Sequence, residues 1–238
     1  MSCINCNIEL TGEFCPTCGE KKDFNRITFS SLIENVFSGF VNMDKGLLFN
    51  IKNLTLHPQK TIFQYIKGKR KYVLNPISYA IITISVYLIL VAFLKEDKLV
   101  ETTEISKKVK SLNKFEKYGY DAGGYIFSKL KFLWLLIIIY LSLFTKLIFK
   151  RFNFFEHITI NAFIVGHSTI IAFFVKIIYH DEILLFNFLV FIYMIYLVYK
   201  VFLNKKEKFF TLTMAVFSVV FAYLMFLIVP FLTMIILK

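Results

Sequence analysis

Long uncharged apolar runs separated by short charged segments occupy most of the chain after residue 71. A helix that crosses about 30 Å of hydrocarbon needs about 20 apolar residues. Five runs come close to this length or exceed it, and they cover residues 72–94, 132–149, 158–175, 183–203 and 209–237. Two of them contain a late cation, Lys146 or Lys200, whose long side chain can reach the headgroups. The pattern therefore predicts an all-α integral membrane protein, with a five-span domain at 72–238 and an outer loop at 95–131.

A different pattern precedes the first run, because the apolar positions between residues 27 and 66 recur every three or four residues, as on one helix face. This periodicity predicts three amphipathic helices, at about 27–41, 44–57 and 58–66. They form a predicted juxtamembrane segment at 25–71. Such helices could pack as a small soluble domain or lie along the lipid headgroups. The basic run Lys67–Lys71 favours anionic headgroups, where each cation contributes ~1 kcal/mol.

The composition supports a lipid environment. Hydrophobic residues make up 57% of the 238 positions, Phe alone supplies 29 of them, and the mean hydropathy is +0.64. These values exclude a disordered chain, an ordinary soluble domain and a disulfide-stapled mini-protein. The net charge is +12, and the short loops after the second and fourth runs are basic. Since Lys and Arg accumulate on the cytoplasmic side, we expect a cytoplasmic amino terminus and a carboxyl terminus outside.

Four cysteines within the first eighteen residues form two Cys-x-x-Cys pairs, Cys3 with Cys6 and Cys15 with Cys18. Paired knuckles of this kind are typical of a tetrahedral Cys₄ zinc site. The sequence therefore predicts a small zinc ribbon at 1–24. All four positions are cysteine, so no coordination position remains for water and the Zn²⁺ is expected to be structural. Gly19, directly after the second pair, suits the tight turn because glycine adopts positive φ without steric cost.

Two disulfides or a redox-active Cys-x-x-Cys are the alternatives to zinc. A cytoplasmic location argues against disulfides, and no βαβ pattern suggests a thioredoxin-like fold. The predicted ribbon carries a net charge of about −1 between Met1 and Arg26, whereas nucleic-acid binding needs a basic face. We therefore expect the ribbon to bind a protein partner and no nucleic acid.

Several short motifs resemble an uncharacterised bacterial family of membrane proteins that carry an amino-terminal zinc ribbon. The motifs are the two knuckles, Leu56-His57-Pro58, the stretch Tyr65-Ile66-x-Gly68-Lys69-Arg70-x-Tyr72-x-x-Pro76, and Phe155-Glu156-His157. The resemblance implies a multi-pass protein of the bacterial inner membrane with a cytosolic zinc module. It implies no reaction, because the family has no known function.

Polar residues in the third run are candidates for function, because polar groups are costly inside a membrane. Asn161 and Ser168 share a helix face and His167 lies next to it. This stripe could line a transport path, with His167 as a proton carrier, or it could form hydrogen bonds between helices. The sequence has no Gly-rich phosphate loop, no His-Glu-x-x-His and no Gly-x-Ser-x-Gly motif. The sequence favours a non-enzymatic scaffold or regulator, with a small transporter or channel subunit as the alternative.

Overall fold

The computed structural model describes residues 2–10, 12–20, 22, 27–32, 43–94, 133–179 and 187–236. Within these residues the fold is helical and contains no β-strand, although an isolated bridge joins Ser2 to Glu9. The helices are α2 (Met43–Leu56), α3 (Pro58–Ile66), α4 (Pro76–Leu94), the 3-10 helix η2 (Trp134–Leu136), α7 (Ile137–Ile148), α8 (Phe154–Tyr179), α9 (Phe188–Phe202) and α10 (Lys208–Ile236). The predicted outer loop at 95–131 lies outside the described residues.

Three helices of the described part are long and apolar enough to cross a membrane. They are α4, α8 and the Lys208–Val229 part of α10, with hydropathies of 2.4, 1.9 and 2.5. Two further apolar helices are shorter, namely η2 with α7 (Trp134–Ile148) and α9. At 1.5 Å per residue each of these reaches about 22 Å. Every predicted span therefore contains a helix, but only three of these helices in the described part are long enough to cross a membrane.

Asparagine side chains define where three of these helices begin. Asn75 Oδ1 accepts hydrogen bonds from the N–H groups two and three residues further on, at 2.9 and 3.4 Å, and Asn187 does the same at 3.0 and 3.2 Å. Asn153 and Glu156 each accept from the other's backbone N–H at 2.7 Å, which is a capping box. Because Asn187 caps α9 from within the predicted run 183–203, the helix is shorter than the run.

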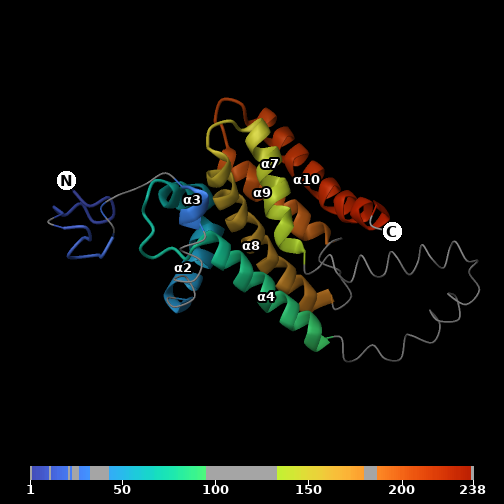
Figure 1. The fold of residues 1–238 in the computed structure, drawn as a ribbon, viewed down its shortest axis with the longest axis horizontal. Coiled ribbons are helices and arrows are strands. Elements are labelled where there is room, and N and C mark those ends of the chain that lie inside the picture. The colour runs from blue at the N-terminus through green and yellow to red at the C-terminus, as the bar shows by residue number, and fades with distance from the viewer. Residues whose placement is uncertain are drawn as a thin grey trace, which may run out of the picture.

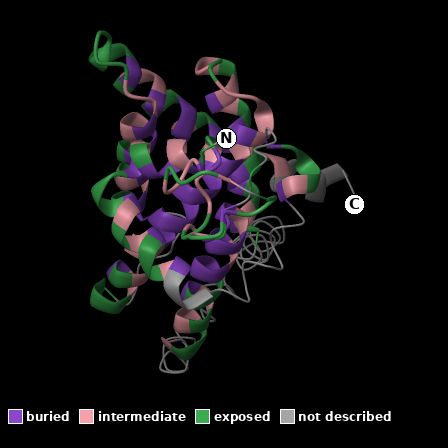
Figure 2. Ribbon diagram, turned by 90° about the vertical axis from the view of Figure 1, so that its left-hand side faces the viewer, coloured by how far each residue is buried: buried purple, intermediate pink, exposed green. Residues whose placement is uncertain are grey.

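Helix α8 is the centre of the bundle. It packs against α4, α7 and α9, and α10 packs against α7 and α9. In its most apolar window 72% of the residues are buried, compared with 39% in α4 and 28% in α10. Figure 2 shows the buried residues along the middle of the bundle and the exposed ones on its outer faces. The short connections 149–153 and 203–207 lie at the same end of the bundle (Figure 1).

Helices α4 and α8 run side by side in the same direction, but α4 begins beside the middle of α8 (Figure 1). The contact is tight at Gly166, where an added Cβ would lie 2.9 Å from the Cα of Ala80 and 3.0 Å from Cδ1 of Tyr79. Only glycine allows the two backbones to come so close, and small residues allow the same kind of close contact between the helices of membrane proteins. Because of the offset, α4 leaves the amino-terminal half of α8 uncovered.

The amino-terminal half of α8 is covered by α2 and α3, which coincide with the second and third amphipathic helices predicted from the sequence. Most of the first, predicted at about 27–41, lies outside the described residues. Tyr65 of α3 meets Phe163 of α8 edge to face at 5.4 Å. The side-chain amide of Gln59 donates to the carbonyl of Val201 in α9 at 3.0 Å. The periodicity predicts these helices but not their packing against the bundle.

Candidate functional site

The four cysteine sulfurs converge in the amino-terminal head, residues 2–20. All four Sγ atoms lie within 4.8 Å of one another, and none of the cysteines forms a disulfide. The close pairs join different knuckles, with Cys3 Sγ at 3.5 Å from Cys18 Sγ and Cys6 Sγ at 3.4 Å from Cys15 Sγ. Zn–S bonds of about 2.3 Å in a tetrahedron place sulfurs about 3.8 Å apart. The donor set therefore fits a tetrahedral metal ion.

The two knuckles repeat one hydrogen-bond pattern. The N–H of the residue after the second cysteine donates to the first cysteine's carbonyl, at 2.9 Å from Asn7 and 2.8 Å from Gly19. The N–H of Cys3 and of Cys15 also donates to the carbonyl five residues further on, at 2.8 Å in both knuckles. Positive φ angles of 62° at Asn7 and 67° at Gly19 close these turns. The conformation expected for Gly19 is confirmed, and Asn7 takes the same role because asparagine tolerates it.

The four thiols lie close enough to shift one another's ionisation. The backbone N–H groups of Cys18 and Thr17 lower the pKa of Cys15 to about 6. The pKa of Cys6 is raised to about 12, because burial and the three neighbouring sulfurs outweigh the hydrogen bond from the Ile8 N–H. Four sulfurs this close repel one another when ionised, and a metal ion removes that repulsion. The cluster can hold a metal and leaves no open position for catalysis at it.

The head is attached to the segment that joins α3 to α4, residues 67–75. Glu20 is 6% exposed, and its Oε2 accepts from the backbone N–H groups of Arg70 and Lys71 at 3.2 and 3.0 Å. A Cβ at Gly19 would lie 2.8 Å from Nζ of Lys71, so that ammonium packs against the second knuckle. The cysteine knuckles and the basic run are thereby held together.

His167 lies at the junction of α2, α4 and α8. Its Nδ1 is 2.8 Å from the hydroxyl of Tyr79, and its Nε2 is 3.1 Å from Oγ1 of Thr55. The Thr55 hydroxyl donates its proton to the carbonyl of Ile51 at 2.7 Å. Nε2–H must therefore donate to Thr55, and Nδ1 accepts from Tyr79. Both ring nitrogens are satisfied in the neutral imidazole, so the contacts support interhelical packing.

Asn161 forms a second set of contacts, between α8 and α7. Its amide nitrogen donates to Oγ of Ser142 at 3.1 Å and to Oγ1 of Thr145 at 2.9 Å. Asn161 Oδ1 and Ser168 Oγ are buried without a hydrogen-bond partner in the described part of the chain. The sequence places Asn161 and His167 on one polar stripe, but the structure gives them separate partners on different helices.

His157 closes the connection between α7 and α8. Its Nε2–H donates to the carbonyl of Phe149 at 3.0 Å, and Nδ1 is 3.0 Å from Oγ1 of Thr145. The ring stacks on Phe202 with 5.5 Å between centroids. His157 thus fixes a loop and joins three helices. Its sequence neighbour Glu156 belongs to the capping box at the start of α8. Both residues therefore have a local structural role.

Two polar residues of the site are not found by sequence reasoning. Asn50 is fully buried, and its side chain both donates to the carbonyl and accepts from the N–H of Leu74, at 3.1 and 3.2 Å. Thr55 reaches His167 across 112 residues of sequence. Both lie in an amphipathic helix where a polar residue is expected to face solvent, so no local signal marks them.

The comparison with protein families agrees in part with the resemblance seen in the sequence. Residues 44–88 match a family described as protein of unknown function (DUF3667). This stretch covers less than half of the chain and includes α2, α3, the basic run and most of α4. The match supports a relationship to an uncharacterised family. No similar curated protein and no similar solved structure is found.

Proposed function

We propose that this protein is a multi-pass protein of the bacterial inner membrane with five helical spans and a zinc-bound cytosolic head that docks a protein partner. Support for counting α7 and α9 as spans comes from their outer faces. Ile139, Leu143 and Leu147 follow one another at four-residue steps on α7 and are 50, 42 and 60% exposed. A stripe of large apolar side chains is unfavourable in water and favourable against lipid. Exposed Leu189 and Ile192 mark a similar face on α9.

The proposed orientation rests on the basic end of the bundle. Lys146 donates to the carbonyl of Phe152 at 2.6 Å, and Arg151 lies 5.0 Å from the ring centroid of Phe63 in α3. Lys200 lies 5.6 Å from the ring centroid of Tyr196. These cations gather where the short connections 149–153 and 203–207 lie. Since positive charge favours the cytoplasmic side, we assign this end, together with the head, to the cytoplasm.

Zinc is the proposed metal, because four thiolates in a tetrahedral arrangement favour Zn²⁺ over oxygen-preferring cations. Cys3, Cys6, Cys15 and Cys18 would hold it. A closed thiolate shell stabilises the fold of a small domain, because the free energy of metal binding is available to folding. We assign no enzymatic reaction to the protein.

The observation that carries the docking role is the apolar surface of the head. Ile8 is 43% exposed and Phe14 is 58% exposed, although the head is small and has few other apolar side chains to bury. Exposed large apolar residues beside a rigid metal-bound turn provide anchors of the kind that protein interfaces use. The net charge of the head makes a nucleic-acid partner unfavourable.

The proposal is tested by photo-crosslinking in intact cells, with a photoreactive amino acid in place of Glu13, which is exposed beside Phe14 in the full chain. We expect a defined protein adduct that disappears when Cys15 and Cys18 are both replaced by Ser, while membrane insertion is retained. Phe14→Ser is expected to keep the metal and lose the partner, and Thr17→Ser, also exposed, is the matched control. Adducts with lipid alone, or a protein adduct that survives loss of the metal, would contradict the docking role.

A further inference from the structure

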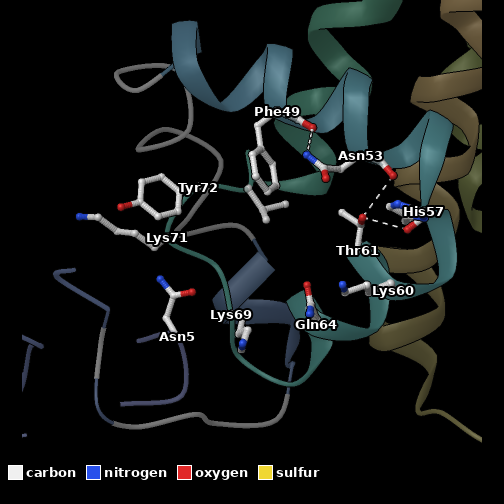
Figure 3. Close-up of a pocket in the computed structure, with 11 residues that line it drawn as sticks. Asn5, Phe49, Asn53, His57, Lys60, Thr61, Gln64, Lys69, Lys71 and Tyr72 are labelled. Atoms are coloured by element: carbon white, nitrogen blue, oxygen red, sulfur yellow. Dashed lines mark hydrogen bonds between the residues drawn. The ribbon is translucent and has the colours of Figure 1, made fainter. Parts of the chain in front are cut away.

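A cavity of about 200 Å³ lies between the head, α2, α3 and the segment before α4. Figure 3 shows Asn5 of the head on one side, Phe49 of α2 on another, and Lys60 and Gln64 of α3 closing the cavity below. Its size is below the roughly 300–1,000 Å³ of sites for drug-sized ligands. The cavity therefore suits a small group, and its walls come from these four parts of the chain.

The lining is basic. Lys60, Lys69 and Lys71 line the cavity together with His57, whereas no Asp or Glu does so. In the part of the chain that the structure describes, no carboxylate forms an ion pair with these lysines. Glu20 is the acid that contacts the segment before α4, and its Oε2 accepts hydrogen bonds from the backbone N–H groups of Arg70 and Lys71. The cavity thus concentrates positive charge that the described residues do not neutralise.

The neutral lining residues provide hydrogen-bond donors. The side-chain amides of Asn5 and Gln64 belong to the lining, and each carries an NH₂ group. Other polar groups are already committed, since Thr61 donates to the carbonyl of His57 at 2.9 Å and Asn53 donates to that of Phe49 at 2.8 Å. The uncommitted donors are those that a tetrahedral oxyanion needs.

We infer that this cavity binds a phosphate group, with Lys60 and Lys69 as its charged ligands and the Gln64 amide as a neutral donor. Lysine binds phosphate as a point charge, and hydrogen bonds to charged groups are stronger than those between neutral groups. The inference does not depend on the docking role of the head. It depends on the head being folded, because Asn5 forms one wall and Lys71 packs against Gly19.

Two sources can supply this phosphate. The cavity lies three residues before the start of α4 at Pro76, and Phe49 and Tyr72, two exposed aromatic residues, flank it. An anionic phospholipid can place its headgroup there from the membrane surface. A soluble phosphomonoester can enter from the cytosol. Both present the same group to the same side chains.

The experiment uses the purified full-length protein with its metal bound. In one arm, native mass spectrometry measures retention of phosphatidylglycerol from nanodiscs of mixed phosphatidylcholine and phosphatidylglycerol. In the other arm, calorimetry measures binding of glycerol 3-phosphate in a neutral detergent at about 0.15 M salt, where long-range attraction is screened. Lys60→Ala, Lys69→Ala and Gln64→Glu are compared with Lys67→Ala, a matched control in the same basic run that does not line the cavity.

We expect each cavity variant to weaken binding about tenfold and the double lysine variant to abolish it, while Lys67→Ala changes it less than about twofold. Gln64→Glu alters no volume and places a carboxylate in the cavity, so it separates loss of binding from loss of fold. Binding in the lipid arm alone assigns the headgroup, and binding in the soluble arm assigns a phosphomonoester. Absence of binding in both arms, or an equal effect of Lys67→Ala, would overturn the inference.

Discussion

The contact between α4 and α8 at Gly166 gives the sharpest test of the packing. In Gly166→Ala the new methyl group would lie 2.9 Å from the Cα and 3.2 Å from the N of Ala80. Carbon atoms pack at about 3.5–4.0 Å, so α4 must move away by more than half an ångström. The opposing atoms belong to the backbone and cannot rotate aside. The same displacement stretches the 2.8 Å contact between Tyr79 and His167.

Two effects of opposite sign determine the result. Alanine has a higher helix propensity than glycine and stabilises a helix interior by about 1 kcal/mol. Overpacking costs about 1–3 kcal/mol, and a clash with backbone falls in the upper part of that range. We therefore expect a net loss of about 1–2 kcal/mol in the free energy of unfolding. For a chain of this size that corresponds to a decrease of about 2–8 °C in Tm, and Gly166→Leu should decrease it further.

The assay is thermal unfolding in detergent, followed by the fluorescence of Trp134, the one tryptophan of the chain. This residue is a suitable reporter because its indole N–H donates to Thr169 of α8 at 3.2 Å. Ser168→Ala is the control on the same helix, since its buried hydroxyl has no partner in the described residues and its removal should be neutral or slightly stabilising. A Tm of Gly166→Ala equal to or above that of the natural protein would refute the close approach.

Three further predictions concern the head and the juxtamembrane helices. Removing the metal with a chelator should make the first 26 residues sensitive to trypsin while the Trp134 transition stays in place, and a head that remains resistant would argue against a structural metal. Asn50→Leu leaves the buried N–H and carbonyl of Leu74 unpaired, so we expect a loss of about 2–4 kcal/mol in chemical or thermal unfolding; unchanged stability would show that these hydrogen bonds contribute little. Burial raises the pKa of Tyr65 to about 12, despite the opposing effect of Arg70, above about 10 in the unfolded chain. The protonated Tyr65 therefore contributes to the free energy of unfolding in full below pH 10, and this contribution is lost as the pH rises to 12. The Tm of Tyr65→Phe should fall less than that of the natural protein over this interval. Identical profiles of Tm against pH for the two proteins would contradict the assignment.

The sequence predicts the helices well where a single run of residues determines them. Each apolar run contains a helix because the backbone must satisfy its hydrogen bonds internally in an apolar surrounding. The cysteine cluster is likewise predicted, since the two pairs have a spacing that brings four sulfurs together. The helix ends are predicted less accurately. Asn187, for example, is uncharged and therefore counts as part of an apolar run, although its side chain caps the start of α9.

The packing of α2 and α3 could not be predicted, because it depends on residues far apart in the chain. Thr55 and His167 each look like a polar residue on a helix, and only the fold shows that they contact each other. The cavity beside the head could not be predicted for the same reason. Lys69 and Lys71 are evident as part of a basic run, but Lys60 and Asn5 join them only through tertiary structure.

The position of α8 also has a consequence for how the chain is made. Its buried polar side chains bond to residues that precede it in the sequence: His167 to α2 and α4, and Asn161 to α7. During synthesis these earlier segments leave the ribosome first. In the proposed membrane arrangement, the costly polar groups of α8 can therefore pair at once with helices made before it, and need not wait for α9 and α10.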